Sequence, residues 1–132
     1  MRRLLLDTHA FLWWLSDSRR LNREARAAIS EASALVHVSA ATIWEIAIKA
    51  ALGRLTFSEA PDVSIPRQLD RCGFQPLAIT VAHGLATRTL PEHHADPFDR
   101  LLIVQARAEG LTLLTADRVF RKYDVPLIDA SR

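Results

Sequence analysis

The stretch from residue 96 to residue 115, DPFDRLLIVQARAEGLTLLT, contains the clearest helix of the chain and the strand that follows it. Asp96 is a good N-cap, Pro97 suits the first helical position, and Gly110 suits the position just past the helix end. The next five residues, LTLLT, form a mostly apolar run that is typical of a strand buried on both faces. A helix followed directly by such a strand is the repeating unit of a parallel α/β sheet.

The same alternation of helices and strands runs along the whole chain. Its 132 residues suit one domain, residues 1–132, with a sizeable core. We expect an α/β fold in which helices cover both faces of a central parallel sheet. The strands are expected at residues 2–7, 34–39, 74–79 (weakened by Pro76), 111–115 and 125–129. The helices are expected at residues 8–15, 22–32 (capped by Asn22), 40–53, 65–73, 80–90, 96–110 and 116–123, with loop or edge structure at 54–64 and a loop at 91–94.

Composition narrows the class of protein without fixing its function. The chain contains no run of eighteen apolar residues, so we expect no membrane span. The one cysteine, Cys72, cannot form an internal disulfide, which fits a reducing cytoplasm. The net charge is +2, and arginine supplies most of the positive charge, a residue suited to phosphate recognition. Two basic clusters are either a footprint for nucleic acid or ordinary solvated helix faces: Arg19, Arg20, Arg23 and Arg26, and Arg118, Arg121 and Lys122.

Several carboxylates stand where a parallel sheet would bind a ligand. In such folds ligands bind at the carboxyl ends of the strands, near a switch in strand order. Asp7 comes directly after the first strand, and Asp117 comes two residues after the strand LTLLT. Asp96 and Asp99 lie at a helix start, and Glu45 lies in the middle of a helix among apolar neighbours. The sequence therefore predicts an acidic site at this edge of the sheet.

Each carboxylate also has an ordinary structural explanation. Asp7, Asp96 and Asp117 could be N-caps, and Asp99 could favour the positive end of its helix. Glu45 could pair with Lys49 one turn on. Capping does not explain why Asp99 and Glu45 lie on apolar stripes of their helices, because a buried charge without a partner is costly. Carboxylates that point into one place repel each other unless a cation lies among them, and Mg²⁺ or Mn²⁺ would suit oxygen ligands and a phosphate substrate.

Four successive motifs carry a resemblance to a known family. They are LLLDTHAFLWWL (4–15), SAATIWEIAIK (39–49), HADPFDRLLIVQA (94–106) and LTLLTADRVFRKY (111–123). In this order, from Arg3 to about Asp129, they resemble the PIN domain family, and most closely the VapC-type ribonuclease toxins of bacterial toxin–antitoxin pairs. Any one motif is weak, but four in register, each with its acid, are highly specific.

The resemblance implies a PIN-like three-layer sandwich and a metal-dependent ribonuclease activity. Carried over residue by residue, it implies that Asp7, Glu45, Asp99 and Asp117 hold a Mg²⁺ or Mn²⁺ ion and carry catalysis. It also implies an RNA substrate, a cognate antitoxin that blocks the pocket, and a homodimer. Asp96 is interpreted as the helix cap, close enough to orient a ligand or water.

Other polar residues around the acids have two explanations each. The hydroxyls of Thr8, Ser39 and Thr115 either orient carboxylates and phosphate oxygens or cap the local backbone. Arg100 either meets a phosphate or forms a structural ion pair. His94 belongs to the family-like run HADPFDR, but the sequence assigns it no role. Trp13, Trp14 and Trp44 fit core or interface packing better than stacking on bases.

Three other functions fit the sequence less well. A phosphatase with Asp7 as nucleophile, in the manner of haloacid dehalogenase-like enzymes, needs a second aspartate where this chain has His9. A zinc site is disfavoured because the five histidines lack ligand spacing. A catalytically silent PIN-like binding module that acts through its partner would not need all four acids.

Overall fold

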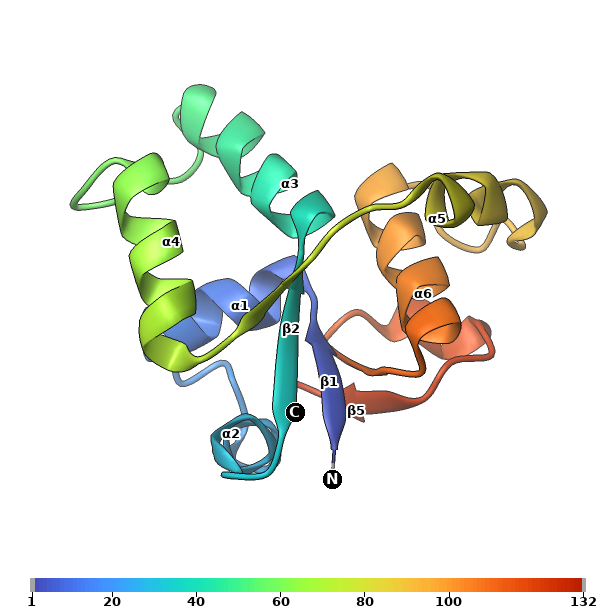
Figure 1. Cartoon of the computed structure of the whole chain (residues 1–132), viewed down its shortest axis with the longest axis horizontal. Coiled ribbons are helices and arrows are strands. Elements are labelled where there is room, and N and C mark those ends of the chain that lie inside the picture. The colour runs from blue at the N-terminus through green and yellow to red at the C-terminus, as the bar shows by residue number, and fades with distance from the viewer. Residues whose placement is uncertain (1, 132) are drawn as a thin grey trace.

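A computed structural model describes residues 2–131 and shows a five-stranded sheet in which all neighbouring strands are parallel (Figure 1). The strand order is β3-β2-β1-β4-β5. The predicted α/β architecture, with a central parallel sheet flanked by helices, is therefore confirmed. The strands are β1 (Arg3–Leu6), β2 (Leu35–Ser39), β3 (Gln75–Leu77), β4 (Thr112–Thr115) and β5 (Leu127–Asp129).

Helices cover the two faces of this sheet and make it the middle of three layers. Alternate residues of β1 point to opposite faces, as the geometry of a strand requires: Leu4 and Leu6 pack in one core cluster and Leu5 in the other. The first cluster includes residues of four helices, α1 (Thr8–Leu15), α2 (Arg23–Ser30), α3 (Ala40–Ala51) and α4 (Pro61–Cys72). The second includes residues of α6 (Pro97–Glu109) and of the 3₁₀ helix η2 (Arg118–Lys122).

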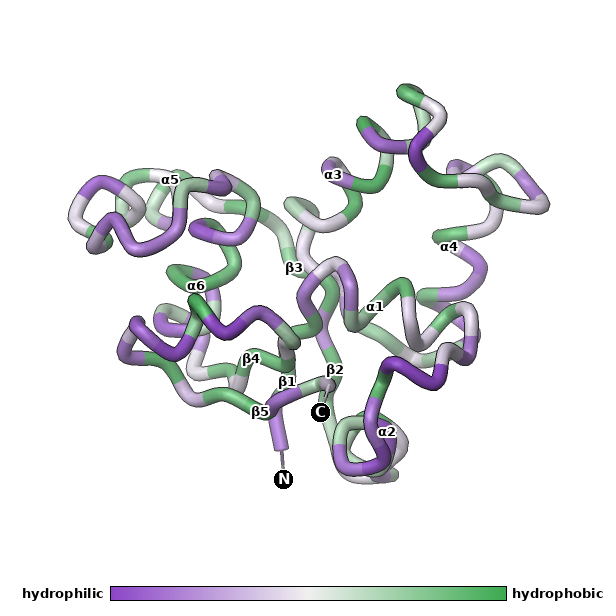
Figure 2. The backbone as a smooth tube through the Cα atoms, turned by 180° about the vertical axis from the view of Figure 1, so that it is seen from behind, coloured by the Kyte–Doolittle hydropathy of each residue, from purple (hydrophilic) through white to green (hydrophobic). Residues whose placement is uncertain are grey.

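Hydropathy follows this layering. Figure 2 shows hydrophobic stretches in the central strands and hydrophilic stretches mostly on the outer helices and loops. The central strand residues Leu4, Leu5, Leu6, Leu113 and Leu114 have no exposed surface. Among residues 2–131, no helix combines the length and the apolar character that crossing a bilayer would require.

Most helix boundaries follow the expected capping chemistry. Asn22 caps α2 by accepting a hydrogen bond from the backbone N–H of Ala25, at 2.7 Å. Asp96 caps α6, Pro97 occupies its first turn, and Gly110 ends it in the left-handed region at φ 67°. The helix α6 therefore begins and ends where the sequence predicts.

Three segments differ from the prediction. Helix α4 begins at Pro61 rather than at residue 65, because proline suits a first helical turn, and Pro66 is tolerated inside it. The segment 80–90 divides into α5 (Val81–Ala86) and the 3₁₀ helix η1 (Thr87–Thr89), and the segment 116–123 forms only the 3₁₀ helix η2. Strand β3 has three residues, which agrees with the weakening expected from its proline.

The sheet order places the switch in chain direction between β1 and β4. After β1 the chain adds β2 and β3 on one side, and then crosses to β4 on the other side. The backbone N–H of Asp7 donates to the carbonyl of Leu114 at 3.1 Å, so the carboxyl ends of these two strands lie together. The residues that follow β1 and β4 therefore face the same space.

Candidate metal centre and active site

Four elements bring the predicted acids to the carboxyl end of the sheet. Asp7 follows β1, Asp117 follows β4, Glu45 lies on α3, and Asp99 lies in the first turn of α6. Asp7 and Glu45 are buried, with 4% and 7% of their surface exposed. The negative charges of Asp7, Glu45 and Asp117 all act on Asp99, so the structure gathers the four carboxylates in one region.

The two carboxylate oxygens of Asp7 have different roles, because one caps helix α1 and the other is bound by Thr115. Its Oδ1 accepts from the backbone N–H of Ala10 at 2.8 Å and so caps α1. Its Oδ2 accepts from the hydroxyl of Thr115 at 2.5 Å. Burial raises the pKa of the Asp7 carboxyl above its ordinary value, and the hydrogen bonds from Thr115 and Ala10 offset part of this rise. The cap and the site residue are thus the same side chain.

Asp117 is built in the same way. Its Oδ1 accepts from the backbone N–H of Val119 at 3.0 Å and caps η2. Its own N–H donates to the hydroxyl of Thr115 at 3.0 Å, and its Oδ2 is left facing the site. Thr115 therefore connects Asp7 to Asp117, which is the orienting role that the sequence left open beside simple capping.

Glu45 is held by one neutral and one charged donor. The Thr8 hydroxyl donates to Oε1 at 2.6 Å, and the Lys49 ammonium lies 2.8 Å from Oε2. The expected pair with Lys49 is therefore present, but it is not a surface contact, because Glu45 is buried. Thr42 also lies beside this group, with its hydroxyl oxygen 3.4 Å from that of Thr8. Thr8 orients a carboxylate and does not cap its helix.

The carboxyl of Asp99 is strongly perturbed by its surroundings. Desolvation, followed by the charges of Asp96, Asp7, Glu45 and Asp117, raises the pKa of the Asp99 carboxyl from 3.8 to about 8. Both causes favour the neutral acid, because burial and like charges each penalise the carboxylate. A cation among these oxygens would relieve both penalties. The crowding of carboxylates therefore fits a hard divalent cation such as Mg²⁺ or Mn²⁺, which prefers oxygen ligands.

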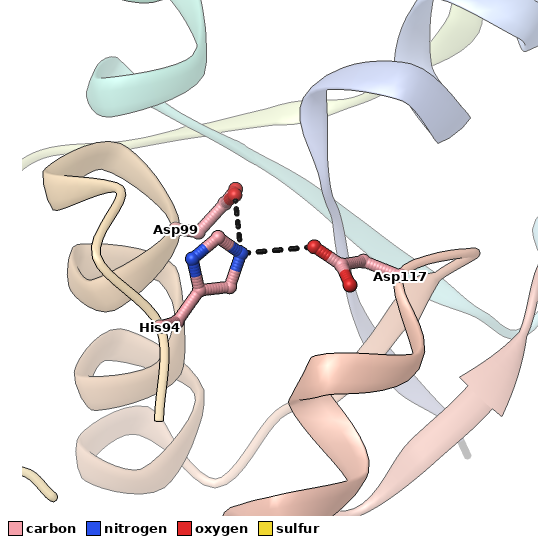
Figure 3. A group of neighbouring side chains, drawn as sticks. All are labelled: His94, Asp99 and Asp117. Atoms are coloured by element: carbon pink, nitrogen blue, oxygen red, sulfur yellow. Dashed lines mark hydrogen bonds and ion pairs between the residues drawn. The ribbon is translucent and has the colours of Figure 1, made fainter. Parts of the chain in front are cut away.

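His94 lies against the acids, a contact that no pattern in the sequence predicts. Its Nε2 lies 2.9 Å from Oδ2 of Asp117 and 3.0 Å from Oδ2 of Asp99 (Figure 3). Within residues 2–131, these three side chains form the group whose ligand atoms lie close enough to share one ion, all within 4.8 Å of one another. The one hint in the sequence that His94 belongs to the site is that it precedes Asp99 in the run HADPFDR. The position of the His94 side chain, however, depends on how the loop at residues 91–96 folds.

The remaining candidate residues support the elements that carry the acids. Ser39 caps α3 by accepting from the N–H of Ala41, and it donates to Oε1 of buried Gln105 at 2.6 Å. Asp96 accepts from the N–H groups of Phe98 and Asp99, so it acts as the helix cap.

Arg100 binds the backbone of the segment that precedes α6. Its guanidinium donates to four backbone carbonyls at 3.0–3.2 Å and so closes the segment 87–94 over the start of α6. The carbonyl oxygens belong to Thr87, Leu90, Pro91 and His94. Among residues 2–131 Arg100 forms no ion pair with a carboxylate.

Comparison with known proteins gives the family of this chain. The family model described as "PIN domain" matches residues 4–126. Ribonuclease VapC22 of Mycobacterium tuberculosis is 32% identical over 127 residues, which cover 96% of this chain and 95% of that protein. The fold is similar to that of VapBC2 from Rickettsia felis bound to a promoter DNA fragment, with a TM-score of 0.73, 13% identity, and 96% and 98% of the two chains covered. It is also similar to DNA-bound VapBC from Salmonella typhimurium, with a TM-score of 0.68, 18% identity, and 98% of each chain covered. The chain therefore belongs to the PIN domain family, in the branch that contains the VapC ribonucleases.

Proposed function

We propose that this protein is a Mg²⁺- or Mn²⁺-dependent endoribonuclease and the toxin of a toxin–antitoxin pair. The observation that carries the proposal is the convergence of four carboxylates from four elements, with the pKa of Asp99 raised to about 8 by its surroundings. The membership in the PIN family, and the likeness to a ribonuclease over almost the whole chain, support RNA as the substrate. We expect the protein to act in the cytoplasm, where RNA is available.

In this proposal Asp7, Glu45, Asp99 and Asp117 hold the divalent cation. When bound, such a cation makes water a nucleophile at neutral pH and stabilises the charge that develops on the phosphate during in-line displacement. The Thr115 hydroxyl fixes Oδ2 of Asp7, and the Thr8 hydroxyl fixes Oε1 of Glu45, so two of the carboxylates are oriented before substrate binds. One carboxylate of the set accepts the proton of the attacking water.

An antitoxin segment would occupy the apolar groove between α3 and α4. The groove has a volume of about 680 Å³. Its lining includes the apolar side chains Ile43, Ile65 and Phe74 and the carboxylates Asp62 and Asp70. These two carboxylates form no ion pair within residues 2–131. An amphipathic segment with basic residues beside its apolar face would complement this surface.

A second copy of the chain would cover the exposed apolar stripe of α3. Trp44, Ile48 and Leu52 lie at successive spacings of four residues, with 58%, 38% and 62% of their surface exposed. Val81 and Leu85 expose 82% and 67% of their surface on α5, which, like α3, packs against α6. Large exposed apolar groups in one region are typical of protein–protein interfaces. We therefore propose a homodimer that buries this stripe.

The test is cleavage of a structured RNA pool by the purified protein with Mg²⁺ or Mn²⁺, with EDTA, and with Asp7→Asn. Asp124→Asn, at an exposed acid that forms no ion pair within residues 2–131, is the matched control. Cleavage that needs the metal, is lost in Asp7→Asn and persists in Asp124→Asn would support the proposal. Metal binding without cleavage would favour a silent binding module, and failure to bind either metal would refute the site.

A further inference from the structure

The imidazole of His94 occupies the space between two carboxylates of the site. Its Nε2 lies 2.9 Å from Asp117 Oδ2 and 3.0 Å from Asp99 Oδ2, and Figure 3 shows the ring edge directed at both. Both distances are within the range of N–H···O hydrogen bonds. A cation shared by Asp99 and Asp117 would need the same oxygen atoms.

The surrounding loop holds this imidazole in place. The backbone N–H of His94 donates to the hydroxyl of Tyr123 at 2.8 Å, and that hydroxyl donates to the carbonyl of Pro91 at 2.8 Å. Arg100 donates to the His94 carbonyl at 3.2 Å. The ring also packs beside Phe120, with 5.5 Å between the ring centroids. Contacts on several sides therefore fix both the backbone and the ring.

One further contact decides what Nε2 can do. The backbone N–H of Asp96 donates to Nδ1 of His94 at 3.2 Å, so Nδ1 is an acceptor. A neutral imidazole has one N–H, so the proton lies on Nε2, which points at the carboxylates. A nitrogen that carries a proton cannot bind a metal. Histidines that do bind metals usually donate through their other ring nitrogen, which is the reverse of this arrangement.

We propose that His94 is a positioning residue that donates from Nε2 to Asp99 and Asp117 and competes with the divalent cation for their oxygens. The inference rests on the proposed function, because it concerns the cation of that same site. Asp99 is anchored by helix α6, and Asp117 is anchored by the N–H of Val119, so neither needs His94 to stay in the site. Removing the N–H frees the ligand oxygens and leaves unrelieved repulsion between them, and both effects strengthen cation binding.

The experiment is calorimetric titration of metal-free protein with Mn²⁺ at one neutral pH. In His94→Phe, which keeps an aromatic ring beside Phe120 but has no donor, the Kd is expected to fall about tenfold to a hundredfold, the size of one hydrogen bond to a charged group. His94→Gln, which can still donate, is expected to lie between this variant and the parent. His93→Phe is the control, because exposed His93 packs on Tyr123 and does not touch the acids. Damage to the site would weaken binding, so tighter binding cannot come from damage.

The outcomes separate this inference from the proposed function. An unchanged or higher Kd in His94→Phe would overturn the competition. Tighter Mn²⁺ binding in His94→Phe, with no RNA cleavage by the parent protein, would uphold the competition and refute the ribonuclease proposal. Failure of both proteins to bind Mn²⁺ would overturn both.

Discussion

Asp99→Asn is expected to stabilise the metal-free protein near pH 8 while abolishing cleavage. The carboxyl of Asp99 has a pKa of about 8, because burial and four neighbouring carboxylates penalise its charged form. Asparagine has nearly the same shape and never carries that charge. The variant should therefore melt at a higher temperature than the parent protein at pH values where Asp99 is ionised in the unfolded chain.

The sign and the size of this effect follow from the pKa. In the unfolded chain the carboxyl ionises near pH 3.8, and in the folded protein near pH 8. Between these values the folded state binds more protons, so the metal-free protein loses stability as pH rises and loses no more above about pH 8. The full shift corresponds to an upper bound of about 5–6 kcal/mol. Asp99 keeps 19% of its side chain exposed, and partial hydration reduces the cost, so we expect about 1–3 kcal/mol.

The assay is thermal unfolding in EDTA at a series of pH values from 4.5 to 8.5. For a chain of this size, 1–3 kcal/mol corresponds to a rise in Tm of roughly 3–12 °C at pH 8. The difference between the two proteins should shrink as pH falls toward 4.5, because the folded carboxyl is neutral there and the unfolded carboxyl approaches its pKa of 3.8. A variant that melts lower at every pH, or a difference that does not depend on pH, would show that Asp99 is not a crowded carboxylate.

Three other changes test separate parts of the site. Asp96→Ala should lower the free energy of unfolding by about 1 kcal/mol, the usual contribution of an N-cap, while RNA cleavage persists at temperatures where the variant is folded. Thr115→Val removes the hydroxyl that donates to Asp7, and it should lower the cleavage rate about tenfold, as expected for an outer partner of a metal ligand; an unchanged rate and an unchanged Mn²⁺ affinity would contradict that orienting role. Ile48→Asp introduces a charge into the exposed stripe of α3, and sedimentation analysis should show a monomer where the parent protein is a dimer.

The parts of the fold that were predicted correctly depend on local chemistry. Strands β1 and β4 are mostly apolar, and α6 carries its own start and stop signals, Asp96, Pro97 and Gly110. Such signals act within a few residues and can be found without knowing the tertiary structure. The start of α4 was missed because Pro61 reads equally well as a loop residue or as a first helical residue.

The site was predictable only in part, for a different physical reason. The carboxylates could be found because each stands at a strand end or on an apolar helix face, in an order that resembles a family. The contacts of His94 and Arg100 could not be found, because both depend on how the segment 87–96 folds back over α6 and η2. No local periodicity encodes the path of an irregular loop. Asp7 and Asp117 could be read as caps or as site residues, and in the structure they are N-caps whose second oxygen faces the site.

The pairing of β1 with β4 also determines when during synthesis the site can exist. The hydrogen bond between Thr115 and Asp7 joins residues separated by 108 positions, and β1 has β4 as one of its two neighbours. A nascent chain whose β4 is still inside the ribosome cannot place Thr115 and Asp117 in the site. One edge of its first strand is then unpaired, and its acidic site lacks these two residues. Contacts this distant in sequence also form late in folding, because closing a long loop costs entropy before any contact is gained. An enzyme of this design therefore gains its site only after most of its message has been translated, and fragments that stop before β4 should leave RNA intact.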